Sequence, residues 1–397
     1  EIFYNEEIIK EKIKNKTDLF NRGHTYTKVE PEKYLPKFNA LLLGIILAQI
    51  LIYHKFLALS IVLWVTTSIV NLILNKPKLR WNNLRFLFVV LYVLYIVGVF
   101  YSINKSNAMF DLEVKMSLVI FPLFISFTNY TVAHIRLLLY VFIGGAILSI
   151  LLLLGNATIN YLETGASGFF FYNRLSPVVH PSYFSFYMNV IMMLLIYDYT
   201  TGKLNLFKRY VHIIIFTFFT LFIALLTAKI ALLTTFVLLC ILLGYWVKNS
   251  KWTAVLLFAV GSLGLFGTIY TQSDFAKERI NDFFNAFELK GTERYLYSTG
   301  LRRAIWQNAW DLYSEKPILG YGTGDVTDNL MVKYAQNNNL NALDKRLNTH
   351  NQFLQTAIAI GLGGLICMVL LMLIPLLYFR RNILFAGFVV MTIFFLL

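Results

Sequence analysis

Charged side chains are scarce in this sequence, since 14% of its 397 residues are charged while 58% are hydrophobic. About a quarter of the residues in soluble domains are charged, so this composition excludes an ordinary water-soluble fold. Many apolar stretches reach the roughly 20 residues that a helix needs to cross a bilayer. The composition therefore predicts an all-α integral membrane protein that crosses the bilayer many times.

Cysteine and acidic residues are also few. Cys240 and Cys367 both lie inside apolar runs, which excludes a disulfide framework and predicts packing roles. Acidic clusters are scarce in the polar segments between the apolar runs, where Asp325 and Asp328 form the nearest pair. We therefore expect neither a metal site nor a cofactor. The sequence also lacks a Walker-type phosphate loop and a nucleophile elbow.

Basic residues outnumber acidic ones, and the formal net charge is +14. Such a charge is compatible with nucleic-acid binding, but the basic residues lie in short loops between apolar runs. This placement is typical of membrane topology rather than of a nucleic-acid surface. We therefore expect membrane lipids as partners, and no nucleic acid.

Apolar runs predict the transmembrane helices and divide the chain. The predicted helices cover 38–54, 56–74, 84–103, 114–128, 133–155, 181–199, 210–227, 229–247, 252–271, 351–379 and 383–397. The chain begins at Glu1 without Met and ends within an apolar run, so we expect a longer natural protein with about 11–12 spans. The predicted organisation is a polar amino-terminal tail, helices 1–9, a cap segment and helices 10–11, covering 1–35, 36–271, 272–350 and 351–397 respectively.

The basic residues alternate between successive loops and so predict orientation. Loops after the even-numbered helices hold Lys76, Lys78, Arg80, Arg85, Arg136, Lys203, Lys208, Arg209, Lys248, Lys251, Arg380 and Arg381. The intervening short loops hold only Lys55, Lys105, Arg174 and Lys229, with Lys115 at a helix edge. By the positive-inside rule the first set and the amino terminus are cytoplasmic, and the cap is external. Within the cap, "LRRAIWQNAWDLYSE" has amphipathic helical patterning and precedes a glycine-punctuated turn, "GYGTG", which predicts a small folded helical unit.

Cationic and titratable residues gather on the predicted external face. They are Arg174, His180, Lys229, Arg302, Arg303 and His350, with Asn351 beside the last of them. Each has an ordinary structural explanation, because arginine and lysine extend toward headgroups, histidine often caps a helix, and Asn351 can cap the tenth helix. Lys229 is the hardest to explain in this way, because a cation close to the apolar layer is costly without an anionic partner or a water-filled cavity.

Taken together, these residues suit recognition of a phosphate-bearing lipid. Guanidinium groups bind phosphate oxygens through paired donors. Fixed cations in a low-dielectric cleft stabilise a departing diphosphate, and an imidazole with a near-neutral pKa can accept a proton from an attacking hydroxyl.

Three segments carry a family resemblance. "RRAIWQNAWDLYSEKPILGYGTGDV" contains Arg-x-x-x-Trp followed by Pro-hydrophobic-Leu-Gly-x-Gly-x-Gly, "LNTHNQFLQTAIAIGLGGL" contains a His-Asn-x-hydrophobic-Leu-Gln helix start, and "NRLSPVVHPSYFSFYMN" is an arginine-containing external segment leading into a helix. In this order they resemble the O-antigen ligase / O-antigen polymerase superfamily of bacterial envelope proteins. Together the segments contain 61 of the 397 residues, about 15% of the chain.

The resemblance implies a GT-C-like, metal-independent, inverting glycosyltransferase of the bacterial inner membrane, with a cytoplasmic amino terminus and a periplasmic active site and cap. Its donor would be a lipid-linked oligosaccharide on undecaprenyl diphosphate, and its acceptor the lipid A–core or another glycan. His350 matches the family's proposed base, while Arg174 and Arg302 match arginines that hold the diphosphate, with Arg303 as their neighbour. Lys229 stands where many members have arginine, so the charge is kept but the bidentate fork is lost. His180 and Asn351 are possible substrate-site residues.

Several functions stay open at this stage. A ligase and a polymerase share the same chemistry and differ in the acceptor that the groove admits, and an oligosaccharyltransferase acting on protein is a weaker variant. A transporter or flippase of lipid-linked anions is less favoured, because the charges gather at one face and the sequence shows no repeated halves.

Overall fold

A computed structural model describes residues 31–79, 82–249 and 298–378, together with Val389, Thr392, Ile393 and Leu396. The helices are α2 (Pro31–Ile52), η1 (His54–Phe56), α3 (Leu57–Asn75), α4 (Asn83–Tyr101), α5 (Lys105–Lys115), α6 (Ser117–Ser126), α7 (Val132–Thr164), η2 (Ser167–Phe170), α8 (Tyr172–Leu175), α9 (Pro181–Thr201), α10 (Arg209–Leu226), α11 (Lys229–Lys248), α14 (Ser298–Glu315), α15 (Val326–Gln336), α16 (Leu340–Asp344) and α17 (Gln352–Tyr378). Within these ranges there is no strand, so the predicted all-α fold is confirmed.

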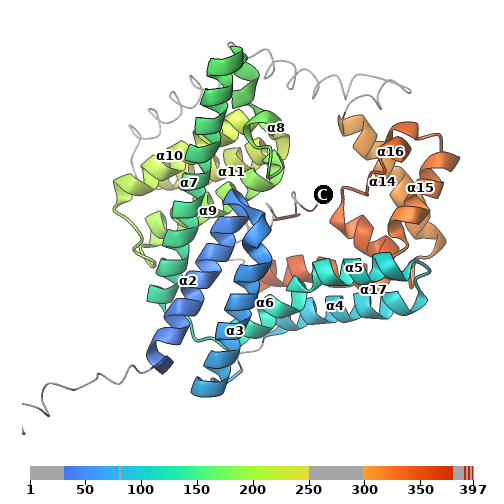
Figure 1. Cartoon of the computed structure of the whole chain (residues 1–397), viewed down its shortest axis with the longest axis horizontal. Helices are drawn as coiled ribbons and strands as arrows, with labels where there is room; N and C mark the ends of the chain where they lie inside the picture. Colours follow the sequence, from blue (N-terminus) through green and yellow to red (C-terminus); the bar gives the residue numbers. More distant parts are fainter. Residues whose placement is uncertain are drawn as a thin grey trace, which may run out of the picture.

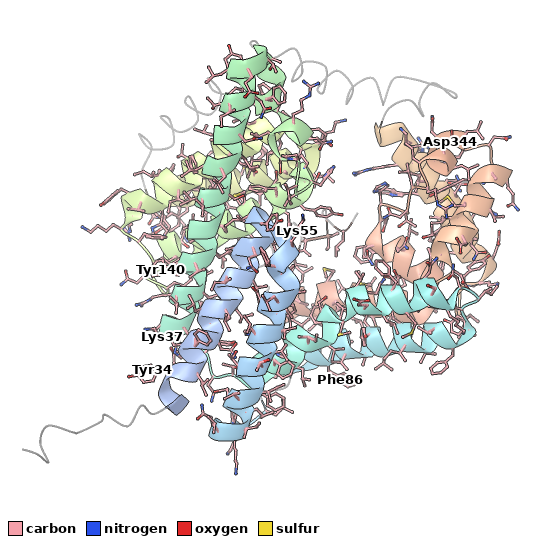
Figure 2. All side chains as sticks on the ribbon, in the orientation of Figure 1. Tyr34, Lys37, Lys55, Phe86, Tyr140 and Asp344 are labelled. Carbon is pink, nitrogen blue, oxygen red and sulfur yellow. The ribbon has the colours of Figure 1, made fainter. Side chains whose placement is uncertain are left out.

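Seven helices in the described ranges are long and apolar enough to span a membrane, which confirms an integral membrane protein. They are Tyr34–Ile52, Leu57–Asn75, Leu84–Tyr101, Val132–Thr164, Arg209–Leu226, Lys229–Lys248 and Gln352–Leu377. The predicted spans 252–271 and 383–397 lie outside the described residues, apart from single residues after 388. Figure 2 labels Lys37 in α2 and Lys55 in η1, just beyond the other end of α2.

Two predicted spans have different helix bounds in the structure, and a third, 181–199, corresponds to α9, which is not among the seven candidate spans. Instead of one helix at 114–128, α5 and α6 meet at Met116, and α6 alone has 10 residues. Such a helix is about 15 Å long, half of the roughly 30 Å hydrocarbon layer, so α6 alone is too short to span it. The second difference is α7, which has 33 residues and ends at Gly165 in a left-handed cap, beyond the predicted end at 155.

The helices form two groups that Figure 1 shows on either side of α3 and α6. One group contains α2 and α7 to α11 and encloses the largest buried apolar cluster. The other contains α4, α14, α15 and α17 around a second cluster. The described part of the predicted cap, 298–350, is helical and belongs to this second group.

An interruption divides α17 near its middle. Ile360 (φ −132°, ψ 19°) and Gly361 (φ 67°, ψ −156°) leave helical geometry. Gly361 is required there, because a Cβ atom at this position would lie 2.0 Å from the carbonyl oxygen of Ile318. The sequence predicted a continuous helix at 351–379, so the interruption is a correction.

The glycine-rich turn after α14 fills this interruption. Three backbone hydrogen bonds join the two segments: Tyr321 N–H donates to Ile358 O (2.8 Å), Gly322 N–H to Ala359 O (2.9 Å) and Leu362 N–H to Pro317 O (2.8 Å). They replace helical bonds that α17 loses, as backbone groups at membrane depth require. The "GYGTG" segment therefore joins the cap to a membrane helix and fixes the position of the residues at the start of α17.

Candidate functional site

His350 lies immediately before α17. Its backbone is in the left-handed region (φ 47°), and its N–H donates to Asn348 Oδ1 at 3.0 Å. A histidine adopts this conformation only when its surroundings hold it there. The imidazole is exposed on the surface of the described chain, at the junction between the cap and α17.

Asn351 caps α17. Its buried side-chain oxygen accepts from the N–H groups of Phe353 (3.0 Å) and Leu354 (3.1 Å). The adjacent Thr349 hydroxyl donates to the carbonyl oxygen of Asn351 at 2.8 Å. Asn351 therefore has the structural role that its residue type predicts.

Arg302 and Arg303 lie in α14, which packs against α17. The buried face of α14 contains Ile305, Ala309 and Leu312, while both guanidinium groups are exposed. Of the two, Arg302 lies near enough to His350 for its charge to act on the imidazole. This agrees with the sequence-based preference for Arg302 over Arg303.

His180 begins α9 as its N-cap, because its Nδ1 accepts from the N–H of Ser182 at 3.3 Å. The neutral ring then carries its proton on Nε2 and can donate a hydrogen bond from that atom. Rings of Tyr172 and Tyr183 flank the imidazole, each with its centroid 6.0 Å away. Tyr183 is 60% exposed, so an aromatic face lies open beside His180.

The pKa of His350 is lowered from its ordinary value. Partial burial is the main cause, the positive charge of Arg302 adds to it, and the electrostatic influence of His180 is the smallest contribution. A lowered pKa keeps the imidazole neutral and able to accept a proton near pH 7. His180 belongs to the first helix group and Arg302 to the second, so His350 stands where residues from both groups approach each other.

Arg174 lies in α8, six residues before His180 in the sequence. Its guanidinium carbon lies 5.6 Å from the centre of the Phe169 ring, and the side chain is exposed. Tyr172, in the same turn of helix, has a left-handed backbone (φ 49°) and contacts His180. The structure therefore places Arg174 in the segment that surrounds His180.

Lys229 is the first residue of α11, and its ammonium nitrogen is buried. Phe184, near the start of α9, contacts Phe222, near the end of α10, with ring centroids 5.4 Å apart, so these helices are antiparallel. The end of α10 and the start of α11 therefore lie at the same end of the bundle as His180. Arg302 and His180 are thus both close enough to His350 to influence it electrostatically, and Arg174 and Lys229 lie at the same end of the neighbouring helices.

The acidic pair Asp325 and Asp328 has a structural role. The buried Asp325 carboxylate accepts from the N–H groups of Ile103 and Asn104, both at 2.7 Å. Asp328 accepts from the Asn104 side-chain amide at 3.0 Å. Among the described residues there is no cluster of three acidic, histidine or cysteine side chains that could hold a metal.

Sequence reasoning missed Tyr172 and Tyr183. Both stand within eight residues of His180. The sequence "HPSY", in which Tyr183 follows His180 by three residues, was the signal available for Tyr183. Aromatic residues are abundant in this chain, at 16%, so their sequence pattern alone did not separate these rings from packing residues.

Residues 213–369 match the family described as O-antigen ligase. The match is consistent with the O-antigen ligase/polymerase superfamily and confirms the resemblance drawn from the motifs. It includes Lys229, Arg302, Arg303 and His350, but neither Arg174 nor His180. An uncharacterized protein of Haemophilus influenzae is 27% identical over 139 residues, an alignment that covers 34% of this chain and 34% of that protein.

Proposed function

Because residues 213–369 match the O-antigen ligase family, we propose that the protein is a glycosyltransferase of the O-antigen ligase type. It moves a glycan from an undecaprenyl-diphosphate-linked donor to a sugar hydroxyl of the lipid A–core, at the periplasmic face of the inner membrane. The observation that supports this proposal best is the position of His350 near both Arg302 and His180, with a lowered pKa.

The proposed step is a direct displacement at the anomeric carbon. The acceptor oxygen forms a bond to that carbon while the bond from the carbon to the diphosphate oxygen breaks, and the leaving diphosphate takes the electron pair. The imidazole of His350 accepts the acceptor's hydroxyl proton, which contributes roughly 10²- to 10⁴-fold to the rate. One displacement inverts the anomeric configuration.

The cations stabilise the leaving group. Arg302 and Arg174 bind oxygens of the diphosphate with paired donors, and Lys229 adds a point charge from the α10–α11 turn. Arg303 contributes at longer range. His180 donates from Nε2 to a substrate oxygen, and Tyr183 offers a ring against which a sugar can pack.

The test uses the full chain in lipid nanodiscs, an undecaprenyl-diphosphate-linked glycan and lipid A–core. We expect glycan transfer with inverted configuration, undiminished by EDTA, and abolished by His350→Ala with donor binding retained. Retained configuration in the product would exclude direct displacement, and full activity of His350→Ala would exclude the proposed base.

A polymerase is the second candidate, because the same step serves an acceptor that is itself a lipid-linked repeat unit. Offering that acceptor in place of lipid A–core separates the two functions. Extension of the lipid-linked glycan, without transfer to lipid A–core, would assign polymerase activity.

A further inference from the structure

Two buried hydroxyl groups lie unpaired near the outer end of α9. Ser185 is fully buried and Thr227 is 9% exposed, and neither side-chain oxygen has a hydrogen-bond partner among the residues that the structure describes. Serine and threonine in membrane helices ordinarily donate to a carbonyl one turn earlier, as Thr220 does to Phe216 at 2.9 Å. Each buried polar group without a partner requires an explanation, such as a bound ligand or water, and here two of them occur close together.

The two hydroxyls lie at the same level of the bundle. One turn further along α9 from Ser185, Asn189 bonds with Thr234 and Thr235 of α11, at 2.8 and 2.9 Å. Residues four apart share a helix face, so Ser185 faces the start of α11, one turn outward. That start is the turn containing Thr227 and Lys229.

The turn itself offers further donors. Thr227 adopts a left-handed conformation (φ 46°), which β-branched residues rarely do. Ala228 is the N-cap of the 20-residue helix α11. Alanine has no side-chain acceptor, so no cap of its own satisfies the first N–H groups of α11. A helix start carries partial positive charge, and here it coincides with the buried ammonium of Lys229.

The chemistry of this cluster selects an anion. Hydroxyl groups, backbone N–H groups and an ammonium group all donate hydrogen bonds, so their ligand is an acceptor with negative charge. Several donors around a helix start are the arrangement that proteins use for phosphate.

We propose that Ser185, Thr227, Lys229 and the start of α11 bind one phosphoryl group. If the proposed function holds, this group is the phosphate attached to the lipid, while Arg302 and Arg174 bind the phosphate attached to the sugar. Ser185 is five residues along α9 from His180, about 7 Å deeper along the helix axis. The deeper position suits the phosphate that is joined to the lipid chain.

The test measures binding and stability on the full chain in nanodiscs, for Ser185→Ala and Thr227→Val. The probes are farnesyl diphosphate, farnesyl monophosphate and inorganic phosphate. Each substitution should weaken binding of both farnesyl compounds about 10-fold or more. The melting temperature of the ligand-free protein should stay the same or rise, because an unpaired buried hydroxyl has been removed. Thr220→Val, which loses a paired hydroxyl elsewhere on α10, should leave both affinities unchanged.

Other outcomes overturn the inference. Unchanged affinities with a lowered melting temperature would show that the hydroxyls bind a structural water. If the substitutions weaken binding of farnesyl diphosphate but not of farnesyl monophosphate, the turn binds the phosphate attached to the sugar. Equal affinity for inorganic phosphate would show an ion site rather than a lipid site.

Failure of this inference is distinct from failure of the proposed function. Transfer that requires His350, with unaltered binding in the hydroxyl variants, would refute only the phosphoryl site. Binding that requires Ser185 and Thr227, in a protein that transfers no glycan, would refute only the proposed function.

Discussion

The two ends of α9 differ in whether their buried polar groups have hydrogen-bond partners. At the end near Thr201, the Asp198 carboxylate accepts from the N–H groups of Leu204, Asn205 and Leu206 at 2.7–2.8 Å. His212 completes the arrangement, with its Nε2 3.1 Å from Asp198. At the other end, His180 is exposed and Ser185 is buried without a partner in the described residues.

This difference separates structural polar groups from available ones. Asp198 has every acceptor position engaged by its own chain, so it stabilises a loop and has no capacity left for a ligand. At the opposite end the hydroxyl groups of Ser185 and Thr227 have no hydrogen-bond partner among the described residues, which costs stability and is typical of binding sites. Substitutions at the two ends should therefore affect different measurements.

The largest effect is expected from His350→Ala. Loss of the proposed base should lower transfer by roughly 10²- to 10⁴-fold, while the melting temperature changes little because the imidazole is exposed. Glycan transfer and thermal unfolding are measured on the same preparation. If His350→Ala lost activity together with a large drop in melting temperature, His350 would have a structural role and not a catalytic one.

Asp198→Ala should produce the reverse pattern. It leaves three N–H groups and His212 without their acceptor, which should reduce the free energy of unfolding by about 3–5 kcal/mol. Transfer per folded molecule should be unchanged, as measured after removal of unfolded protein. Asp198→Asn, which keeps an acceptor oxygen, should cost less. If Asp198→Ala were stable but inactive, Asp198 would not be a purely structural residue, and the two ends of α9 would not differ as described.

Arg302→Ala and Arg303→Ala form a matched pair on one helix. Arg302 acts on His350 and is proposed to hold the diphosphate, so its loss should weaken donor binding about 10-fold or more. Arg303→Ala should weaken binding several-fold less, because both are exposed and only Arg302 acts on the imidazole. Equal effects in a binding titration would mean that general positive charge, rather than position, is what matters.

The smallest effect is a shift in pH dependence. Since the pKa of His350 is lowered, kcat/KM should fall with acid only below the ordinary histidine value of 6.5. Arg302→Gln removes a positive charge that disfavours protonation, so the pKa should rise and the acid limb should move to higher pH. A limb that stays in place would mean that another group controls the rate.

Long apolar runs made most of the membrane helices predictable. The bounds of α3, α10 and α11 agree with prediction within a few residues, because a span needs a fixed length of apolar chain. The division at Met116 and the interruption at Gly361 were missed for a different reason. The partner of Gly361 is a turn some 40 residues earlier in the chain, so no local pattern could predict the pairing.

The site was predictable as a set of residues but not as a geometry. His350, Arg302 and His180 could be assigned to one face from topology, whereas their proximity depends on the packing of two helix groups. Ser185 and Thr227 look like ordinary hydroxyls of membrane helices, and only the structure distinguishes them from Thr220. No motif in the sequence around Ser185 or Thr227 marks these residues as part of a binding site.

The interruption in α17 also constrains how the protein is assembled. A hydrophobic segment enters the bilayer as a continuous helix, since unpaired backbone groups are too costly there. Gly361 can leave helical geometry only after Pro317, Tyr321 and Gly322 have reached it. We therefore expect the turn to dock after α17 has been inserted, so that His350 reaches its final position late in biogenesis.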